Sequence, residues 1–352
     1  MDDSLDILLL TKKPYRQLII TNAVSMFDFR IYLFARQIQL LLESNQPVEA
    51  LKRSKFFISS LSRTLSEYEI SLIPFFTESW VYSACNSVVS QCDEVLAVFE
   101  YSKESMIAYQ GLKAELLHFA RLQLDSLGCI SEMIPFSINN SPEHLIARKN
   151  QKGLETNFNQ ITNAELKDCL KNKQVFDDAY MKLTNRAIRS FGLGNRDRSV
   201  WALKNDNAYL YYYRSEYAKA AEIWESIASN YAIDKWTTLH TSILFNLSHC
   251  FKNLKLETEF VKVAIGLLSN FNVNLEDGFR FVDEISKYSF SMDTQISIES
   301  SVIFKFTTLG LINKVGDDQD IVADVLITSL LPCVFSINKG FQNRSCCFGY
   351  DW

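Results

Sequence analysis

The chain has 352 residues, of which 47% are hydrophobic and 22% charged, and its formal net charge at pH 7 is −5. This length leaves room for two or more domains, and the composition is typical of a folded chain and excludes wholesale disorder. The negative charge argues against a nucleic-acid binder that depends on overall basic charge, and the lack of an apolar run of about 18 residues argues against a membrane span, so we expect a cytosolic protein.

Residues 1–24 form a lead-in to a long helical pattern over residues 25–45. Apolar side chains recur there at steps of four and three, which places them on one helix face that another element must cover. They are Phe27, Ile31, Phe34, Ile38 and Leu41. Ser25 and Asp28 have the spacing of a capping box, and a carboxylate is favourable at the positive end of a helix. We therefore expect Asp28 to cap this helix rather than to contact a partner.

Three side chains are candidates for partner contacts. Arg30 and Arg36 could bind a partner, or their aliphatic stems could simply cover apolar surface, and the sequence favours neither interpretation. Tyr212 belongs to a dense run of tyrosines between positions 209 and 213, which one helix cannot bury completely. Packing on an adjacent hairpin is favoured for this run, with an interface contact through Tyr212 as the alternative.

The helical pattern continues over residues 48–67, from Pro74 to about residue 99, and from a cap at Ser102 to about residue 127, where Gly128 is expected to end it. With only 11 Gly and 6 Pro in the chain, we expect long helices with few sharp loops. Residues 25–128 are therefore predicted to be the first part of a stacked helical array, an α-solenoid. Residues 129–163 show no sustained period and are predicted to be a surface loop.

A second set of helices is predicted over residues 164–290, with breaks near residues 192–195, 214–215, 232–234, 253–256 and 272–276. The clearest pair spans residues 198–231 and has the small and large side chains of a tetratricopeptide-like hairpin. These are Ala208, Tyr211, Tyr217, Ala220 and Trp224. The match is partial, because Ile227 and Ala232 depart from the repeat, so we predict a repeat-like hairpin.

Beyond residue 291 the period changes from helical to two. Val302, Phe304 and Phe306 alternate with more polar neighbours, a Gly-Asp-Asp turn follows at residues 316–318, and a second alternating run covers residues 321–327. Residues 291–338 are therefore predicted to be strands, and residues 339–352 an irregular tail. Two or three strands are too few for a sandwich of about seven. We accordingly expect a truncated or mis-spliced gene model.

Residues 25–37 resemble the large subunit 10 family of the TRAPP II vesicle-tethering complex, whose middle region has a similar run. Residues 180–269 resemble later helical hairpins of that family, but their sequence pattern is less distinctive. The first run is carried here by Ser25, Phe27, Asp28, Phe29, Arg30, Tyr32, Leu33, Phe34, Arg36 and Gln37. The resemblance implies a mainly α fold, an α-solenoid followed by immunoglobulin-like β-sandwiches.

For function, the resemblance implies a non-catalytic scaffold subunit of a complex that tethers vesicles and exchanges nucleotide on Rab GTPases. The implied partners are other TRAPP subunits and, through the complex, a Rab GTPase and the Golgi or endosomal membrane. No nucleic acid is expected as a partner. The alternative is a helical-repeat adaptor of another pathway, with an accidental likeness at residues 25–37.

Signals for catalysis, cofactors and metals are weak. The four histidines at positions 118, 144, 240 and 249 lack metal-ligand spacing, so we expect no metal or cofactor. Gly192 and Gly194 suggest a helix C-terminal turn rather than a dinucleotide loop, because they follow a helical segment. Cys85 and Cys92 lie on one helix face and are predicted to be core thiols. A third, enzymatic hypothesis places a site at His144 in the 129–163 loop, without a second catalytic group nearby.

Overall fold

The computed structural model describes residues 14–67, 72–135, 158–268 and 275–289, together with the backbone of strands at 304–308, 313–315, 320–322 and 325–329. The chain divides into two compact units after Ser215. Each unit is described by itself below.

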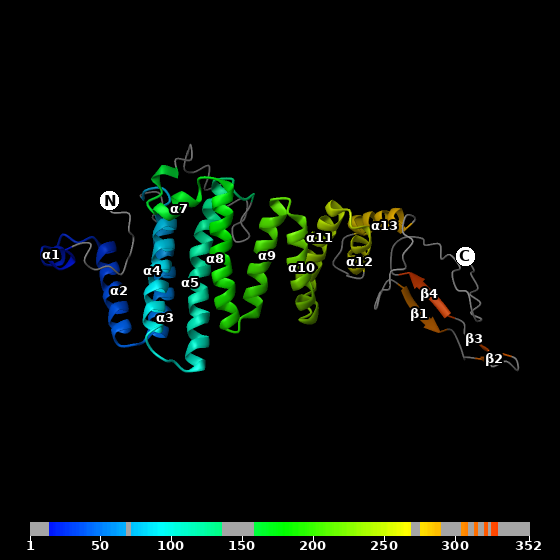
Figure 1. Ribbon diagram of the computed structural model, residues 1–352, viewed down its shortest axis with the longest axis horizontal. Coiled ribbons are helices and arrows are strands. Elements are labelled where there is room, and N and C mark those ends of the chain that lie inside the picture. Colours follow the sequence, from blue (N-terminus) through cyan, green and yellow to red (C-terminus); the bar gives the residue numbers. More distant parts are fainter. Residues whose placement is uncertain are drawn as a thin grey trace. The chain divides into compact units, whose positions relative to one another are not determined.

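Unit 1 is a stack of antiparallel helices (Figure 1). Its elements are α1 (Tyr15–Ile20), α2 (Met26–Glu43), α3 (Pro47–Glu67), α4 (Phe76–Leu96), α5 (Lys103–Ile130), the short 3-10 helix η2 (Phe158–Gln160), α7 (Ala164–Cys169), α8 (Lys173–Leu193) and α9 (Asp197–Tyr213). Long helices that follow one another along the chain pack together, in the order α2, α3, α4, α5, α8 and α9, and α3 also contacts α5. This arrangement agrees with the predicted helical solenoid.

One continuous apolar core runs through unit 1, from Ile31 on α2 to Leu210 on α9. At the α2 end, the Phe34 ring stacks on Phe57 with 4.1 Å between centroids, and Phe57 in turn lies edge-on to Trp80. Ile31, Phe34 and Ile38 are buried, as their helical spacing predicts. Stacked and edge-on aromatic pairs add to the stabilisation that apolar burial provides. They fix how α2 sits on α3.

Two glycines let α5 and α8 approach closely. A Cβ at Gly128 would lie 2.4 Å from Cζ of Phe176, and a Cβ at Gly194 would lie 2.8 Å from the backbone N of Gly111. Gly128 therefore does not end α5, as the sequence suggested, because the helix continues to Ile130 and Gly128 makes room for the Phe176 ring. Glycine in a helix interior costs about 1 kcal/mol relative to alanine, which this packing must offset.

Short turns join the helices close to the predicted breaks, although most of these turns contain no glycine. Residues after several helices adopt the left-handed conformation with φ between 55° and 61°, namely Asn45, Asn195, Ser215, Lys235 and Lys255. Backbone N–H groups then reach back to the last turn, as from Gln46 to the Leu41 carbonyl and from Arg196 to the Phe191 carbonyl, both at 2.9 Å. These bonds form the Schellman arrangement that ends many helices, here without glycine.

Other predicted boundaries shifted by a few residues. The third helix begins at Phe76 rather than at Pro74, because Phe75 has a φ of 62° and cannot belong to the helix. The predicted loop at 129–163 contains the last residues of α5 and the short helix η2, and residues 136–157 lie outside the described residues. A break between α7 and α8 that the sequence did not predict falls where the Asn172 side chain accepts the N–H of Val175.

Unit 2 contains four helices and two short strand ladders among its described residues. The helices are α10 (Tyr217–Ile233), α11 (Thr237–Leu254), α12 (Glu257–Leu268) and α13 (Leu275–Ser289), each packed on the next. Trp224, Leu247 and Phe260 are buried in them. The tetratricopeptide-like hairpin predicted at 198–231 straddles the two units and stays a prediction.

The strands of unit 2 form two separate antiparallel pairs. β1 (Phe304–Thr308) pairs with β4 (Val325–Ser329), with Phe306 opposite Ile327. β2 (Asn313–Val315) pairs with β3 (Asp320–Val322), with Lys314 opposite Ile321. The described strands thus make no facing pair of larger sheets, and the predicted immunoglobulin-like sandwich is not supported by them.

Candidate functional site

The start of α2 is capped as predicted. Ser25 Oγ accepts the backbone N–H of Asp28 at 3.0 Å, and the Ser25 hydroxyl donates to Asp28 Oδ2 at 2.9 Å. An N-cap hydroxyl satisfies one of the donors that a helix leaves unpaired at its first turn, and the Asp28 carboxylate lies at the positive end of the helix dipole. Ser25 is therefore the N-cap, and Asp28 joins it at the helix start through its backbone N–H and its carboxylate, at the spacing that predicts a cap.

An open groove runs along the outer side of α2 and has a volume of about 720 Å³. Its apolar centre includes Leu33 and Leu40, which are 51% and 47% exposed. Arg30, half-buried, and Arg36, exposed, also line it, so the structure brings both predicted partner contacts to one surface. The full lining is Arg30, Leu33, Phe34, Arg36, Gln37, Leu40, Leu41, Ser44 and Phe57. We call this surface the α2 groove.

The guanidinium of Arg36 makes one hydrogen bond within the helix, from Nη1 to Gln39 Oε1 at 2.9 Å. A guanidinium has five N–H donors, so most of the binding capacity of Arg36 is not used by that bond. None of the nine residues that line the α2 groove is acidic. The groove thus combines exposed apolar surface with positive charge.

Tyr212 does not belong to this groove. It lies on α9, half-buried, with its ring edge-on to Tyr213 at 6.1 Å between centroids, and Tyr213 stacks on Tyr209 at 6.2 Å. Tyr209, Tyr211, Tyr212 and Tyr213 are all half-buried, in keeping with the expectation that one helix cannot bury the whole run. An interface role for Tyr212 stays a prediction.

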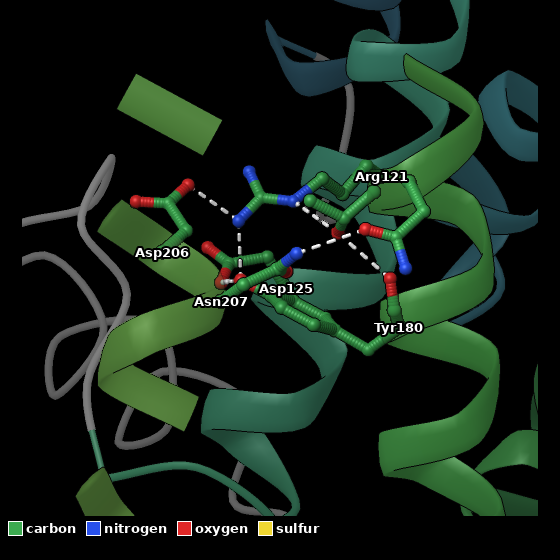
Figure 2. Close-up of polar contacts among 7 residues, drawn as sticks. Arg121, Asp125, Tyr180, Asp206 and Asn207 are labelled. Carbon is green, nitrogen blue, oxygen red and sulfur yellow. Dashed lines mark hydrogen bonds and ion pairs between the residues drawn. The ribbon is translucent and has the colours of Figure 1, made fainter. Parts of the chain in front are cut away.

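A buried ionic cluster, which the sequence did not predict, joins α5, α8 and α9 in unit 1 (Figure 2). At its centre the fully buried Arg121 donates from Nη2 to Asp206 Oδ2 at 2.5 Å and from Nε to Thr184 Oγ1 at 3.0 Å. Nη2 also donates to the hydroxyl of Tyr180, whose ring lies under the guanidinium at 4.8 Å. Side chains from three helices therefore converge on one cation.

The cluster contains two carboxylates for one guanidinium. Asp125, also buried, accepts a long hydrogen bond of 3.5 Å from the Tyr180 hydroxyl. Burial raises the pKa of Asp206 to about 6, and the Asp125 carboxylate adds to this effect, although the Arg121 guanidinium opposes it. Burial lowers the pKa of the neighbouring His118 to about 4, assisted by the positive charge of Arg121. An acid and a base that both interact with the Arg121 charge thus have strongly shifted pKa values.

The geometry of this cluster suits helix packing rather than chemistry on a substrate. The cavity beside Asp125, Tyr180 and Asp206 has a volume of about 10 Å³, which is room for no more than a single water molecule. Breaking a buried ion pair by removing one partner typically costs about 3–5 kcal/mol, because the other charge stays buried. The cluster is therefore a strict constraint on how α5, α8 and α9 pack.

The helical spacing of residues in α5 contains a signal for this cluster. Leu117, Ala120 and Leu124 lie on the buried side of α5, and Arg121 and Asp125 fall at steps of four from Leu117. A charged pair on an apolar helix face is rarely buried unless it has partners elsewhere in the fold. The prediction of functional residues did not include Arg121 and Asp125.

Other predicted features behave as core elements. Cys85 and Cys92 are buried free thiols, and burial raises the pKa of Cys92 to about 12, so neither suits redox chemistry. Gly194 caps the C-terminus of α8, as expected.

No group of three His, Cys, Asp or Glu in the described part of the chain could hold a metal ion. His144 lies outside the described residues.

Membrane insertion through a helix finds no support in the described residues. None of the helices there combines the length and the apolar character that crossing a bilayer requires.

Comparison with known proteins identifies the family. The model of the TR130 NTS domain matches residues 48–278. Trafficking protein particle complex subunit 10 of Homo sapiens is 26% identical over 295 residues, which are 80% of this chain and 23% of that protein. The Dictyostelium discoideum subunit 10 is 43% identical over 82 residues, which are 23% of this chain and 6% of that protein.

A protein of Saccharomyces cerevisiae is also similar to this chain. Trafficking protein particle complex II-specific subunit 130 of Saccharomyces cerevisiae is 26% identical over 278 residues, which are 73% of this chain and 22% of that protein. The chain thus spans less than a quarter of the length of these three relatives. Because the family model covers more than half of the chain, the chain belongs to the TRAPP II large-subunit family.

Proposed function

We propose that this chain is a non-catalytic scaffold segment of a TRAPP II-like complex, which tethers vesicles and exchanges nucleotide on a Rab GTPase in Golgi and endosomal traffic. The observation that carries the proposal is the family match over residues 48–278, which covers nearly all of α3 and the helices from α4 to α12. The curated relatives are named as subunits of such a particle. Stacked helices present extended surfaces, which suit the binding of other subunits better than the binding of a small substrate.

The proposed partners are other TRAPP subunits, reached directly, and a Rab GTPase and the membrane, reached through the assembled complex. In this proposal the chain holds subunits in position and supplies no catalytic group to nucleotide exchange. Arg30, Arg36 and Tyr212 are the proposed contact residues. A helical-repeat adaptor of an unrelated pathway is disfavoured, because the chain belongs to the TRAPP II large-subunit family.

Affinity purification tests the proposal. The full-length large subunit that contains this chain, tagged and expressed in its own cells, should recover the small core TRAPP subunits, and a version lacking residues 14–289 should recover fewer. A size-matched helical-repeat protein with the same tag is the control. Failure of the full-length protein to recover any core subunit would overturn the proposal.

The scaffold role has its own measurement. Release of a fluorescent guanine nucleotide from a Rab GTPase should be accelerated by the assembled complex and unaffected by this chain alone. Acceleration by the isolated chain would show that it carries exchange activity itself and would contradict a non-catalytic role.

A further inference from the structure

The α2 groove has the periodicity of a helix-binding surface. Leu33 and Leu40 are seven residues apart, so they lie almost in line along the outer side of α2, with Gln37 between them. Two large apolar side chains about half exposed at this spacing form a seam of the kind that pairs with a second helix. The seam and its flanks extend from Arg30 to Ser44, or about 21 Å along a helix at 1.5 Å per residue.

The charge of the groove selects the kind of helix. Arg30 and Arg36 are its only charged lining residues, and both are cations. An arginine favours a carboxylate partner, because its planar fork can form two parallel hydrogen bonds to the two oxygens. A helix in this groove would therefore pack apolar residues on Leu33 and Leu40 and place Asp or Glu side chains on its flanks.

A second groove on the same helix carries the opposite charge. It lies between α2 and α4, also has a volume of about 720 Å³, and is lined by Glu43 and Glu94 among polar neighbours, with no cation among its lining residues. An acidic helix would be repelled there and attracted on the other side. The two grooves flanking α2 thus differ in sign, which gives a partner a reason to choose one of them.

A membrane is a poorer match for the same residues. Attraction to an anionic lipid surface uses clusters of roughly four to eight basic side chains. The α2 groove has two, Arg30 and Arg36. The chemistry of the groove fits a protein helix better than a lipid surface.

We propose that the α2 groove binds an acidic amphipathic helix of another subunit of the complex, through Leu33 and Leu40 in the seam and Arg30 and Arg36 at its flanks. This inference rests on the proposed function, because it takes the partner from the same complex. It adds the chemistry of the partner and the surface that receives it.

Photo-crosslinking within the assembled complex identifies the occupant. A benzoylphenylalanine at Leu33 or Leu40 of the full-length large subunit should crosslink to one peptide of another subunit, with apolar residues at helical spacing and at least two carboxylates. The same probe at Gln91, in the groove with Glu43 and Glu94, is the positional control. A crosslink from Leu33 to the same large chain, to lipid, or to a peptide without carboxylates would overturn the proposal, as would no crosslink at all.

Charge reversal tests the role of the arginines. The double variant Arg30→Glu/Arg36→Glu should weaken retention of the crosslinked subunit at least about tenfold, and changing its mapped carboxylates to Lys should restore retention. The matched control Glu43→Lys/Glu94→Lys reverses two charges in the other groove and should leave retention unchanged. Equal retention by the arginine variant, or no rescue by the exchanged charges, refutes the assignment.

The two proposals can fail separately. If wild-type protein recovers core subunits but the groove variants behave like wild type, only the groove assignment fails. If wild-type protein recovers none, both fail.

Discussion

Asp206 in the buried cluster provides a quantitative test through the pH dependence of folding. Its pKa is about 6 in the folded chain, against an ordinary value of 3.8, because burial penalises the charged form. Between these pH values the folded state binds more protons than the unfolded state, so the stability that this group contributes is present below pH 3.8 and is lost as the pH rises towards 6. At about 1.4 kcal/mol for each pKa unit, the loss is about 3 kcal/mol.

His118 has the opposite effect in almost the same pH range. Its pKa is lowered from 6.5 to about 4, so its contribution is present above pH 6.5 and is lost as the pH falls through 4. The magnitude is again about 3 kcal/mol. In the wild-type chain these two dependences largely cancel. A substitution of either residue should expose the dependence of the other.

The perturbation is Asp206→Asn, which keeps the shape and an oxygen acceptor for Arg121 while removing the carboxylate. The free energy of unfolding of this variant, minus that of the wild type, should rise by about 3 kcal/mol between about pH 4 and pH 6. His118→Gln should shift the same difference in the opposite direction. Taking the difference from the wild type removes the titration of all unchanged groups.

The difference in free energy of unfolding between variant and wild type is measured by urea titration, with hydrogen exchange of peptides from α5 and α8 as the readout. These peptides report on unit 1, which contains the cluster. Asp168→Asn is a matched control, because the Asp168 side chain is 63% exposed and an exposed ion pair contributes little to stability. A difference for Asp206→Asn that stays constant from pH 4 to pH 6 would refute the reasoning, since it would mean that burial does not disfavour the ionised form.

Three further substitutions test the packing and the helix ends by urea denaturation. Gly128→Ala should destabilise the chain by about 1–3 kcal/mol despite the better helix propensity of alanine, because its Cβ would overlap the Phe176 ring. Adding Phe176→Leu should recover part of that loss. A neutral effect of Gly128→Ala would contradict the close approach of the two residues. Ser25→Ala should cost about 1 kcal/mol through loss of the cap to the Asp28 N–H, whereas Ser25→Asp should retain most of the stability. Lys255→Gly should stabilise the chain by up to about 1 kcal/mol, because the residue has a φ of 57°, and a loss of stability there would argue against the left-handed turn.

Local patterns predicted the helices of this chain well. The spacing of Ile31, Phe34 and Ile38 gave the buried face of α2, and Ser25 and Ser102 gave the caps of α2 and α5. These features depend on neighbours within one or two turns, so the sequence displays them directly. The breaks at residues 214–215 and 253–256 were also predicted, but the left-handed conformation of Ser215 and Lys255 was not, because no glycine marks it.

Features that depend on distant parts of the chain escaped prediction. Gly128 was predicted to end a helix. Its structural role is to leave space for the Phe176 ring of α8, which the local sequence does not indicate. Arg121 and Asp206 are 85 residues apart, and no local period connects them. Similarly, the sequence singled out Arg30 and Arg36 as possible contacts, but only the packing of α2 on α3 shows that they share a groove.

The shared guanidinium of Arg121 has a consequence for how unit 1 opens. Helices that pack only on their neighbours can unfold one at a time from an end of the stack, with little effect on the rest. Detaching α9 would leave Arg121 without the Asp206 carboxylate, so α5, α8 and α9 should exchange their amide hydrogens as one foldon. No side chain of α2 takes part in these Arg121 contacts, so the amide hydrogens of α2 should exchange separately from that foldon.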